Sequence, residues 1–401
     1  MAVKLDLYRI FCEVAEEESI SDAAKSLYIS QSAVSQSIRQ LEERIFAAAG
    51  QQFNINSPKQ LGKVLFEDLG LPHGKKTKTG WSTNADVLEK LKDHPLVADV
   101  LTYRQYAKLK STYADGLLKV IDPDGRIRTS FQMTVTATGR LSSTEPNLQN
   151  IPVRSPLGRE MRKFFVARDG YVLVDADYSQ IELRVLAHIS GDRNMIKAFN
   201  DNTDIHTVTA SEVFDMPPQL VTPIMRSRAK AVNFGIVYGI GAFSLAKDIG
   251  VSRSEADEYI KGYLRHYSGV DKYMHDVVEK AKKDGYAETM FARRRYLPEL
   301  TASNANTRAF GERVARNMPI QGTAADIIKI AMIRVYERLE RENLAAKLIM
   351  QVHDELIVEA PENEKERVSA LLKEEMENAV KLSVALTADV HSGRTWYDAK
   401  G

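Results

Sequence analysis

The sequence predicts a mixed α+β protein, in which a helical N-terminal part precedes alternating strands and helices. Residues 4–45 carry apolar residues at helical spacing, and residues 85–117 read as two helices separated at Pro95. The stretch VLVDADYSQIELR, residues 172–184, reads as a buried strand followed by a helix. KLIMQVHDELIVEA, residues 347–360, reads as two strands joined by a tight turn. The 401 residues, 44% of them hydrophobic, suffice for two to four domains or subdomains.

The composition excludes several classes of protein. The chain has one cysteine, Cys12, so it has neither a disulfide framework nor a cysteine zinc site. The start, MAVKLDLYRI, lacks the apolar core of a signal peptide, and no apolar run approaches the ~20 residues of a membrane helix. We therefore expect a soluble cytoplasmic protein. The net charge of +1 does not decide whether the protein binds nucleic acid, because a basic groove can exist within a neutral total.

The N-terminal segment predicts two short helices around a turn at residues 29–30. Ser21 and Ser30 are suitable N-caps, and Ala33, Val34, Ile38 and Leu41 form an apolar stripe on the second helix. Residues 4–45 resemble the helix-turn-helix of LysR-type transcription regulators, in which the second helix enters the major groove. The resemblance implies that this helix exposes Gln31, Ser32, Ser35, Gln36 and Arg39.

An ordinary amphipathic helix pair would show the same pattern. The family's wing, which should follow Ile45, and its effector domain are missing, so we do not expect operator binding. The helices would then cover an apolar face of the neighbouring segment. After Phe46 the sequence pattern changes, and residues 53–72 predict a turn followed by an amphipathic helix.

Two aspartates end the apolar strand at residues 172–178. Asp175 and Asp177 are two residues apart, so they project from the same face of a strand. Like charges this close are costly unless a cation lies between them. A strand that reaches solvent and a metal-binding strand end both remain open here.

A row of cations and aromatic rings follows Thr222 and Pro223, which predict the start of a helix. Steps of four along a helix drift by only ~40°, so the row lies on one slowly winding stripe. Cations near a helix N-terminus suit a polyphosphate, and aromatic faces suit a nucleobase. The alternative is a charged surface beside two core aromatics. The four residues of the row are Arg226, Lys230, Phe234 and Tyr238.

Two polar stretches supply hydrogen-bond donors that could follow a nucleic-acid backbone and minor groove. In residues 134–154, Gly139 permits close backbone approach. The donors there are Arg140, Asn147, Gln149, Asn150 and Arg154. The donors in residues 311–329 are Arg313, Asn317 and Gln321.

Five motifs together are similar to those of family A DNA polymerases of the bacterial DNA polymerase I type. They are TATGRLSSTEPNLQNIPVR, DYSQIELR, RSRAKAVNFGIVYG, NMPIQGTAADIIK and QVHDELIVE, they occur in the family's order, and the resemblance covers about residues 49–401. It implies an α+β right-hand fold with an antiparallel-sheet palm, helical fingers and a partial helical thumb, after the short all-α segment. The implied divisions are 1–45 (helix-turn-helix segment), 46–128 (thumb), 129–200 (palm), 201–310 (fingers) and 311–401 (palm).

The resemblance also implies the roles of individual residues. Asp177 and Asp354 bind two Mg²⁺ ions, for which Mn²⁺ can substitute, and Glu355 belongs to the catalytic set. Lys230 also donates a proton to the leaving group. The residues implied at the dNTP are Arg226, Lys230, Phe234, Tyr238, Glu182, His206 and Gln180. The DNA-binding set is the eight donors above together with His353.

Glu182 occupies the position that excludes a ribose 2′-hydroxyl in the family. Phe234 in place of tyrosine predicts discrimination against dideoxynucleotides, which Phe234→Tyr should relax. Asp175 lies outside the motif.

The implied function is template-directed DNA synthesis, which adds deoxynucleotides to a primer 3′-hydroxyl. We expect a monomer that works on primer-template DNA near the bacterial nucleoid, without a membrane partner. Proofreading and 5′-nuclease activity are not expected, and a short thumb should weaken DNA binding. The alternative is a regulator-like chimera whose polymerase part is inactive.

Overall fold

The computed structural model describes residues 36–74, 76–77, 80–151 and 156–401. It has two compact units. Unit 1 comprises Met1–Ser130 and Thr144–Val166, and unit 2 comprises Phe131–Ser143 and Ala167–Gly401. Most of the segment compared with LysR-type regulators, including Gln31, Ser32 and Ser35, lies outside the described residues, as does Arg154.

Unit 1 is built on short helices around one apolar core. Its elements are a helix at residues 36–49, α3 (Pro58–Lys63), the π-helical η1 (Val64–Asp68), β1 (Lys76–Thr77), β2 (Gly80–Trp81), α4 (Ala85–Glu89), α5 (Pro95–Lys108), η2 (Leu109–Ala114), α6 (Asp115–Leu118), η3 (Leu148–Asn150), α7 (Pro156–Glu160) and η4 (Met161–Phe164). Ser57 and Asn84 cap α3 and α4 by accepting hydrogen bonds from Gln60 N and Val87 N. Pro95 begins α5, as the predicted break requires.

The helix at residues 36–49 runs without interruption past Phe46, where the sequence pattern changes. Leu41 and Ile45 are 2% and 0% exposed and pack in one cluster with residues of α3, α4 and α5, such as Leu61 and Val100. The described part of the N-terminal segment therefore covers an apolar face of unit 1. Gln36 and Arg39 are exposed on the same helix.

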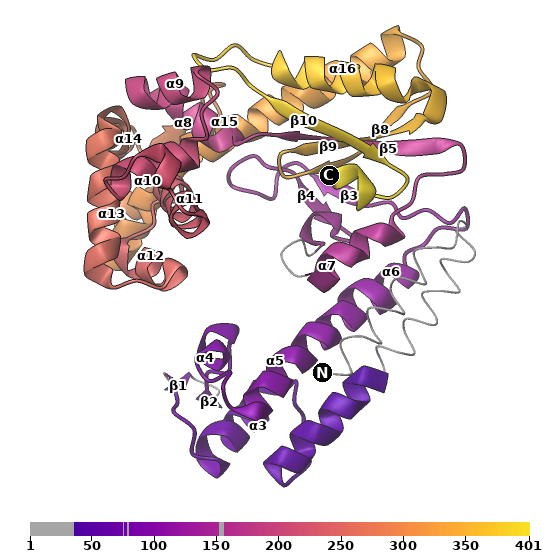
Figure 1. The fold of residues 1–401 in the computed structure, drawn as a ribbon, viewed down its shortest axis with the longest axis vertical. Helices are drawn as coiled ribbons and strands as arrows, with labels where there is room; N and C mark the ends of the chain where they lie inside the picture. Colours follow the sequence, from indigo (N-terminus) through magenta and orange to yellow (C-terminus); the bar gives the residue numbers. More distant parts are fainter. Residues whose placement is uncertain (1–35, 75, 78–79, 152–155) are drawn as a thin grey trace. The chain divides into compact units, whose positions relative to one another are not determined.

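The centre of unit 2 is a four-stranded antiparallel sheet in the order β10-β5-β9-β8. The strands and the elements next to them are β5 (Tyr171–Tyr178), α8 (Ile181–Ser190), β8 (Lys347–Val352), β9 (Glu355–Pro361), α16 (Lys365–Glu377), β10 (Ala388–Gly393) and η8 (Asp398–Lys400). Helix α16 lies along one face of the sheet (Figure 1). Val174 of β5 and Val358 of β9 are fully buried in the same core as Leu371 of α16. The predicted strand–helix and hairpin pairs are thus confirmed, and they meet in one sheet.

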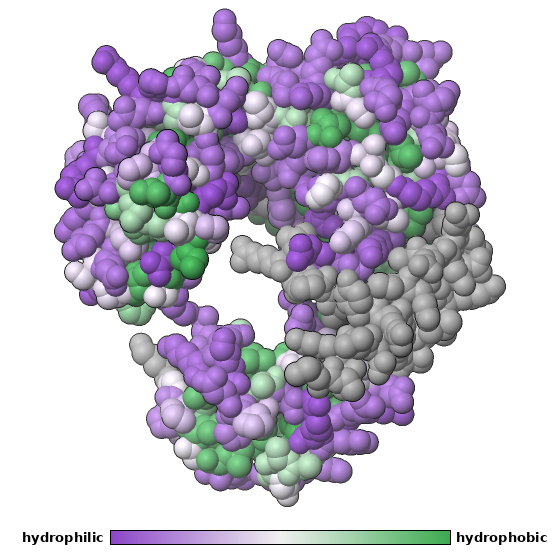
Figure 2. All heavy atoms as spheres, in the orientation of Figure 1, coloured by the Kyte–Doolittle hydropathy of each residue, from purple (hydrophilic) through white to green (hydrophobic). Residues whose placement is uncertain are grey.

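A cluster of helices extends from one end of this sheet (Figure 1). Its helices are α9 (Arg193–Asn200), α10 (Ile205–Val213), α11 (Pro223–Val237), α12 (Ala242–Ile249), α13 (Arg253–His266) and α14 (Ser268–Asp284). Hydrophilic residues cover most of the visible face, and apolar residues form smaller patches, one of them over this cluster (Figure 2). Large apolar side chains that are exposed here are those of Leu220, Ile224 and Phe243.

Helix α15 (Ala305–Arg341) is 37 residues long and connects this cluster to the sheet. The boundary predicted between residues 310 and 311 therefore falls inside a helix. Residues 144–166, which the sequence suggested as palm, group with unit 1. The remaining short strands form two-stranded sheets, β3 (Ser130–Gln132) with β4 (Ser142–Thr144) and β6 (Tyr286–Glu288) with β7 (Arg294–Tyr296). No helix among the described residues is long and apolar enough to cross a membrane.

Candidate active site

The end of β5 and the β8–β9 turn bring two predicted ligands together. Asp177 lies opposite Glu355 in the register of β5 and β9. The backbone N–H of Tyr178 donates to the Asp354 carbonyl over 3.1 Å. His353 has a left-handed backbone with φ of +54°, which is what allows so tight a turn between the strands. The turn thus fixes Asp354 beside the strand end that carries Asp177.

Asp177, Asp354 and Glu355 lie together at this end of the sheet and form the carboxylate corner. Burial, followed by the neighbouring Asp177 carboxylate, raises the pKa of Asp354 to about 7. The Lys400 ammonium lies 2.8 Å from Asp177 Oδ2 and also contacts Glu355 Oε2. Burial alone would lower the pKa of Lys400, but the charges of Glu355, Asp175 and Asp177 outweigh burial and raise it. The cation that the sequence required between like charges is therefore a lysine from the far end of the chain.

This corner fits a divalent ion that also binds substrate oxygens. The described ranges contain no group of three or more His, Cys, Asp or Glu side chains placed to hold a metal. They do contain the Asp177–Asp354 pair, and Asp177 Oδ1 is buried with no hydrogen-bond partner in the described structure. Mg²⁺ binds through one or two carboxylates while keeping water or phosphate ligands. The pair would leave the remaining coordination positions of such an ion to water or to oxygens of a ligand.

Helix α11 carries the predicted row of cations and rings. Thr222 caps it by accepting from Met225 N over 3.3 Å, as the sequence predicted. Lys230 is exposed and forms no hydrogen bond or ion pair with the described residues. Phe234 and Tyr238 lie with ring centroids 6.5 Å apart and planes 19° apart. Tyr238 is the C-cap, so the helix ends just before it.

Arg226 of the row forms an ion pair with Asp204, which the sequence did not indicate as a site residue. Its Nε lies 2.5 Å from Asp204 Oδ2, and its Nη2 lies 3.2 Å from Asp204 Oδ1. Burial opposes ionisation of Asp204, but hydrogen bonds from Arg226 and Thr207 lower its pKa to about 2. An anionic ligand of Arg226 would therefore have to exchange with this carboxylate.

His206 is held by a buried polar network. Asn233 Nδ2 donates to His206 Nδ1 over 3.1 Å and to Thr209 Oγ1 over 3.1 Å. Thr209 Oγ1 is also 3.3 Å from the Tyr267 hydroxyl. Burial, opposed by the Asp204 charge and aided by Arg226, lowers the pKa of His206 to about 4, so the ring is neutral at pH 7. Because Nδ1 accepts, the proton is on Nε2.

We expect Asn233→Ala to lower the free energy of unfolding by about 1–3 kcal/mol, because it removes the Asn233 hydrogen bonds to buried His206 Nδ1 and Thr209 Oγ1. Urea denaturation of the variant and the wild type measures this. Asn306→Ala, at an exposed position of α15, is the control and should change stability by less than about 0.5 kcal/mol. Equal stability of Asn233→Ala and the wild type would contradict the network.

Glu182 links α8 to α11 and to the polar loop before it. Its Oε1 accepts from Arg140 Nη2, and Tyr238 lies close enough to influence the pKa of the carboxylate. Burial raises the pKa of Glu182, while Arg140 and Tyr238 offset part of that effect. The Oε1 of Gln180, which caps α8 with φ of +56°, is buried without a partner in the described structure. Tyr238, Glu182 and Asp354 interact electrostatically, so the row on α11 and the carboxylate corner form one site.

The loop that carries Arg140 is fixed to α15. Lys329 Nζ donates to the Gly139 carbonyl. A Cβ on Gly139, which has φ of +80°, would lie 2.5 Å from Arg293 Nε, so only glycine fits. Arg293 is itself held by Asp326 at 2.6 Å. These contacts explain why a small residue precedes the arginine.

The predicted DNA-binding donors divide between the units. Arg313, Asn317 and Gln321 follow at steps of four on α15, so they share one face of unit 2. Arg140 and His353 also belong to unit 2, whereas Asn147, Gln149 and Asn150 belong to unit 1. The side chain of Asn147 accepts from Gln149 N at 3.1 Å as a cap of η3. Among the described donors, those of unit 2 therefore share a unit with Asp177 and Asp354.

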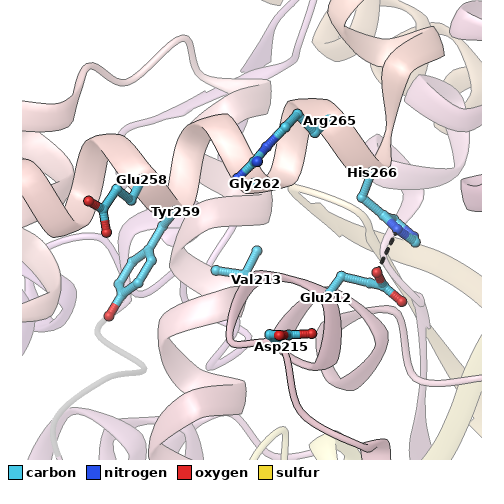
Figure 3. Close-up of a pocket in the computed structure, with 8 residues that line it drawn as sticks. All are labelled: Glu212, Val213, Asp215, Glu258, Tyr259, Gly262, Arg265 and His266. Atoms are coloured by element: carbon cyan, nitrogen blue, oxygen red, sulfur yellow. Dashed lines mark ion pairs between the residues drawn. The ribbon is translucent and has the colours of Figure 1, made fainter.

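A surface pocket of about 760 Å³ lies elsewhere, between α10 and α13 (Figure 3). His266 Nδ1 pairs there with Glu212 Oε2 at 3.0 Å. The other lining residues are Val213, Asp215, Glu258, Tyr259, Gly262 and Arg265. None of the predicted site residues lines it, so this pocket is separate from the candidate active site.

An antiparallel sheet with paired carboxylates, next to a helix bearing a cationic and aromatic row, is the arrangement expected of a nucleic-acid polymerase. The family model for DNA polymerase family A matches residues 24–398, and the chain belongs to this family. That match begins inside residues 4–45. Residues 24–45 are thus accounted for by the polymerase family, and the LysR resemblance gains no support.

Similar proteins include DNA polymerase I of Bacillus caldotenax, which is 55% identical over 371 residues, 92% of this chain and 42% of that protein. The thermostable DNA polymerase I of Thermus thermophilus is 51% identical over 367 residues, 90% of this chain and 44% of that protein. The chain thus spans less than half the length of these relatives. A solved structure of the POL domain of Pol1 from M. smegmatis, in complex with DNA primer-template and dNTP, matches with a TM-score of 0.90 and 44% identity, over 99% of this chain and 70% of that one.

Sequence reasoning missed Lys400, Trp396, Asn233 and Asp204. Asn233 directly precedes Phe234, and a fully buried amide in a helix must find partners, which is a usable signal. Lys400 lies 223 residues from Asp177 and gives no local signal.

Proposed function

We propose that the chain catalyses template-directed DNA synthesis, adding deoxynucleotides from dNTPs to a primer 3′-hydroxyl. The observation that carries the proposal is the Asp177–Asp354 corner joined through Glu182 and Tyr238 to the cationic row of α11. The relatives named DNA polymerase I, and the solved complex with primer-template and dNTP, support this substrate class. The carboxylate sheet would be the palm, the α9–α14 cluster the fingers, and the helices of unit 1 up to α6 the thumb.

In the proposed mechanism, Asp177 and Asp354 would hold two Mg²⁺ ions. Bound there, the ions would lower the pKa of the primer hydroxyl and neutralise charge on the leaving pyrophosphate. Lys230 binds the triphosphate and donates a proton to the leaving group. Arg226 exchanges Asp204 for phosphate oxygens, and neutral His206 lies near them as a further donor.

The sugar and base of the dNTP would meet the aromatic end of α11. Phe234 packs on them, and Tyr238 closes the site near the template base. Gln180 contributes its unpartnered amide oxygen to the same site. The primer-template would contact the minor-groove donors, and we propose that the protein acts as a monomer on DNA in the nucleoid. The proposed donors are Arg140, Asn147, Gln149, Asn150, Arg154, Arg313, Asn317, Gln321 and His353.

Single-nucleotide incorporation tests the proposal. Four primer-templates that differ only in the first unpaired template base are each offered one dNTP at a time with Mg²⁺. The proposal predicts that the complementary nucleotide is added fastest on every template. Addition that ignores the template base would contradict template-directed synthesis.

Glu182→Ala is expected to raise ribonucleotide incorporation relative to deoxynucleotide incorporation by about 10- to 100-fold. In the proposed binding mode, the buried Glu182 carboxylate would occupy the space of a ribose 2′-hydroxyl, and removing it would open that space. Ratios of kcat/KM for rNTP and dNTP measure the effect, with Glu258→Ala in α13 as the control. An unchanged ratio would show that Glu182 does not set sugar selection.

A further inference from the structure

Lys400 is fixed inside the carboxylate corner by the elements around it. It belongs to η8, which follows β10 after a short turn. Thr395 Oγ1 donates to Asp398 Oδ2 over 2.7 Å and accepts from Asp398 N over 3.2 Å, which closes that turn. A Cβ on Gly393 would lie 2.4 Å from Asp398 Cβ and 2.7 Å from Ala399 N. The turn therefore packs directly on the end of β10 and presents Lys400 at a defined position.

The same turn engages both oxygens of Glu355. The buried Trp396 indole donates from Nε1 to Oε1 over 3.1 Å, and Lys400 Nζ contacts Oε2. Glu355 is only 4% exposed. An incoming cation could bind Glu355 only by displacing one of these donors.

The two carboxylate oxygens of Asp177 differ in their contacts. Its Oδ2 lies 2.8 Å from Lys400 Nζ, whereas its Oδ1 has no hydrogen-bond partner in the described structure. One oxygen of Asp177 is thus neutralised from within the chain, and the other remains unpaired. Among the contacts described above, only that of Lys400 accounts for this difference between the two oxygens.

We infer that Lys400 is a positioning residue that decides which carboxylates bind the metal ion. Its ammonium group binds Glu355 and one oxygen of Asp177 and keeps them from the metal ion, so that Asp177 Oδ1 and Asp354 are the protein ligands. Glu355 then acts through Lys400 and Trp396 and does not touch the metal. The inference rests on the proposed function for the presence of a divalent ion.

Removing the lysine charge should strengthen cation binding. A unit charge a few ångströms away costs a bound cation considerable free energy even in a solvated site. We therefore expect Lys400→Met to lower the dissociation constant for Mn²⁺ by at least about tenfold. Lys400→Arg keeps the charge and should change it by less than about threefold. Lys373→Met, on the exposed side of α16, makes the same change in total charge and should have no effect.

The decisive variant removes both charges of the Lys400–Glu355 pair. Lys400→Met combined with Glu355→Gln leaves the net charge of the corner unchanged. If Glu355 is not a ligand, this double variant binds Mn²⁺ within about threefold of the wild type. If Glu355 is a ligand, the double variant loses affinity as Asp354→Asn does, and the inference is overturned.

Mn²⁺ titration of the full chain, followed by electron paramagnetic resonance, measures these constants. The binding of interest is the part that Asp177→Asn removes, and thermal melting checks that each variant is folded. Absence of any Asp177-dependent binding, or an unchanged constant in Lys400→Met, would also overturn the inference. Primer extension by the wild type is scored separately: metal binding without extension would contradict the proposed function, and the Mn²⁺ constants would still decide the role of Lys400.

Discussion

Replacing Asp177 or Asp354 with asparagine should lower the rate of nucleotide addition by at least about a thousandfold, which corresponds to about 4 kcal/mol in the activation free energy. Each substitution keeps the size of the side chain and removes one of the two negative charges that would hold the metal ions. Asp177 Oδ1 is buried without a hydrogen-bond partner in the described structure, so this oxygen is available to a metal ion.

Single-turnover extension of a labelled primer by one nucleotide measures this loss. Asp276→Asn, on the exposed face of α14, makes the same chemical change away from the site and should leave the rate unchanged. Circular dichroism and thermal melting establish that the variants are folded. A rate within about tenfold of the wild type for Asp354→Asn would remove it from the ligand set.

Lys230→Met should lower the rate of addition by about 10²- to 10⁴-fold, the range of a lost general acid. Lys230 is exposed on α11 and forms no ion pair with the described residues, so its charge and proton are available to a triphosphate. Lys230→Arg should recover part of the loss, because arginine keeps the charge but does not readily give up a proton. Dependence of the rate on dNTP concentration separates binding from chemistry.

The matched control for this prediction is Lys261→Met in α13, whose ammonium pairs with Asp257 and is largely exposed. It should leave both the maximal rate and the dNTP dependence unchanged. If the dNTP concentration that gives half the maximal rate rises while the maximal rate is preserved, Lys230 is a binding residue and not the general acid. A change of less than about fivefold in both quantities would exclude it from the site.

Local signals in the sequence predicted the elements that position the site. An apolar run ending at Asp177, a cap at Thr222 and a turn at residues 353–354 each depend on a few neighbouring residues, and each is confirmed. Steps of four also placed Arg226, Lys230 and Phe234 on one helix. Tyr238 falls just beyond its end, because α11 ends at Val237 and the chain turns at Gly239.

Contacts between distant segments could not be predicted in this way. Lys400 reaches Asp177, and Trp396 reaches Glu355, only because β10 and β9 both pair with β5. The helix at residues 36–49 likewise depends on tertiary packing, since Ile45 is buried against the core of unit 1. The N-terminal pattern resembled LysR-type regulators, but the polymerase family model matches the chain from residue 24.

Primer extension tests the central claim most directly. A labelled primer on a DNA template receives Mg²⁺ and four dNTPs, with the wild type beside an Asp177→Asn, Asp354→Asn double variant. The account predicts full-length product from the wild type and none from the double variant, at equal DNA binding. No extension by a folded wild type at high enzyme concentration and low salt, or equal extension by the double variant, would contradict it.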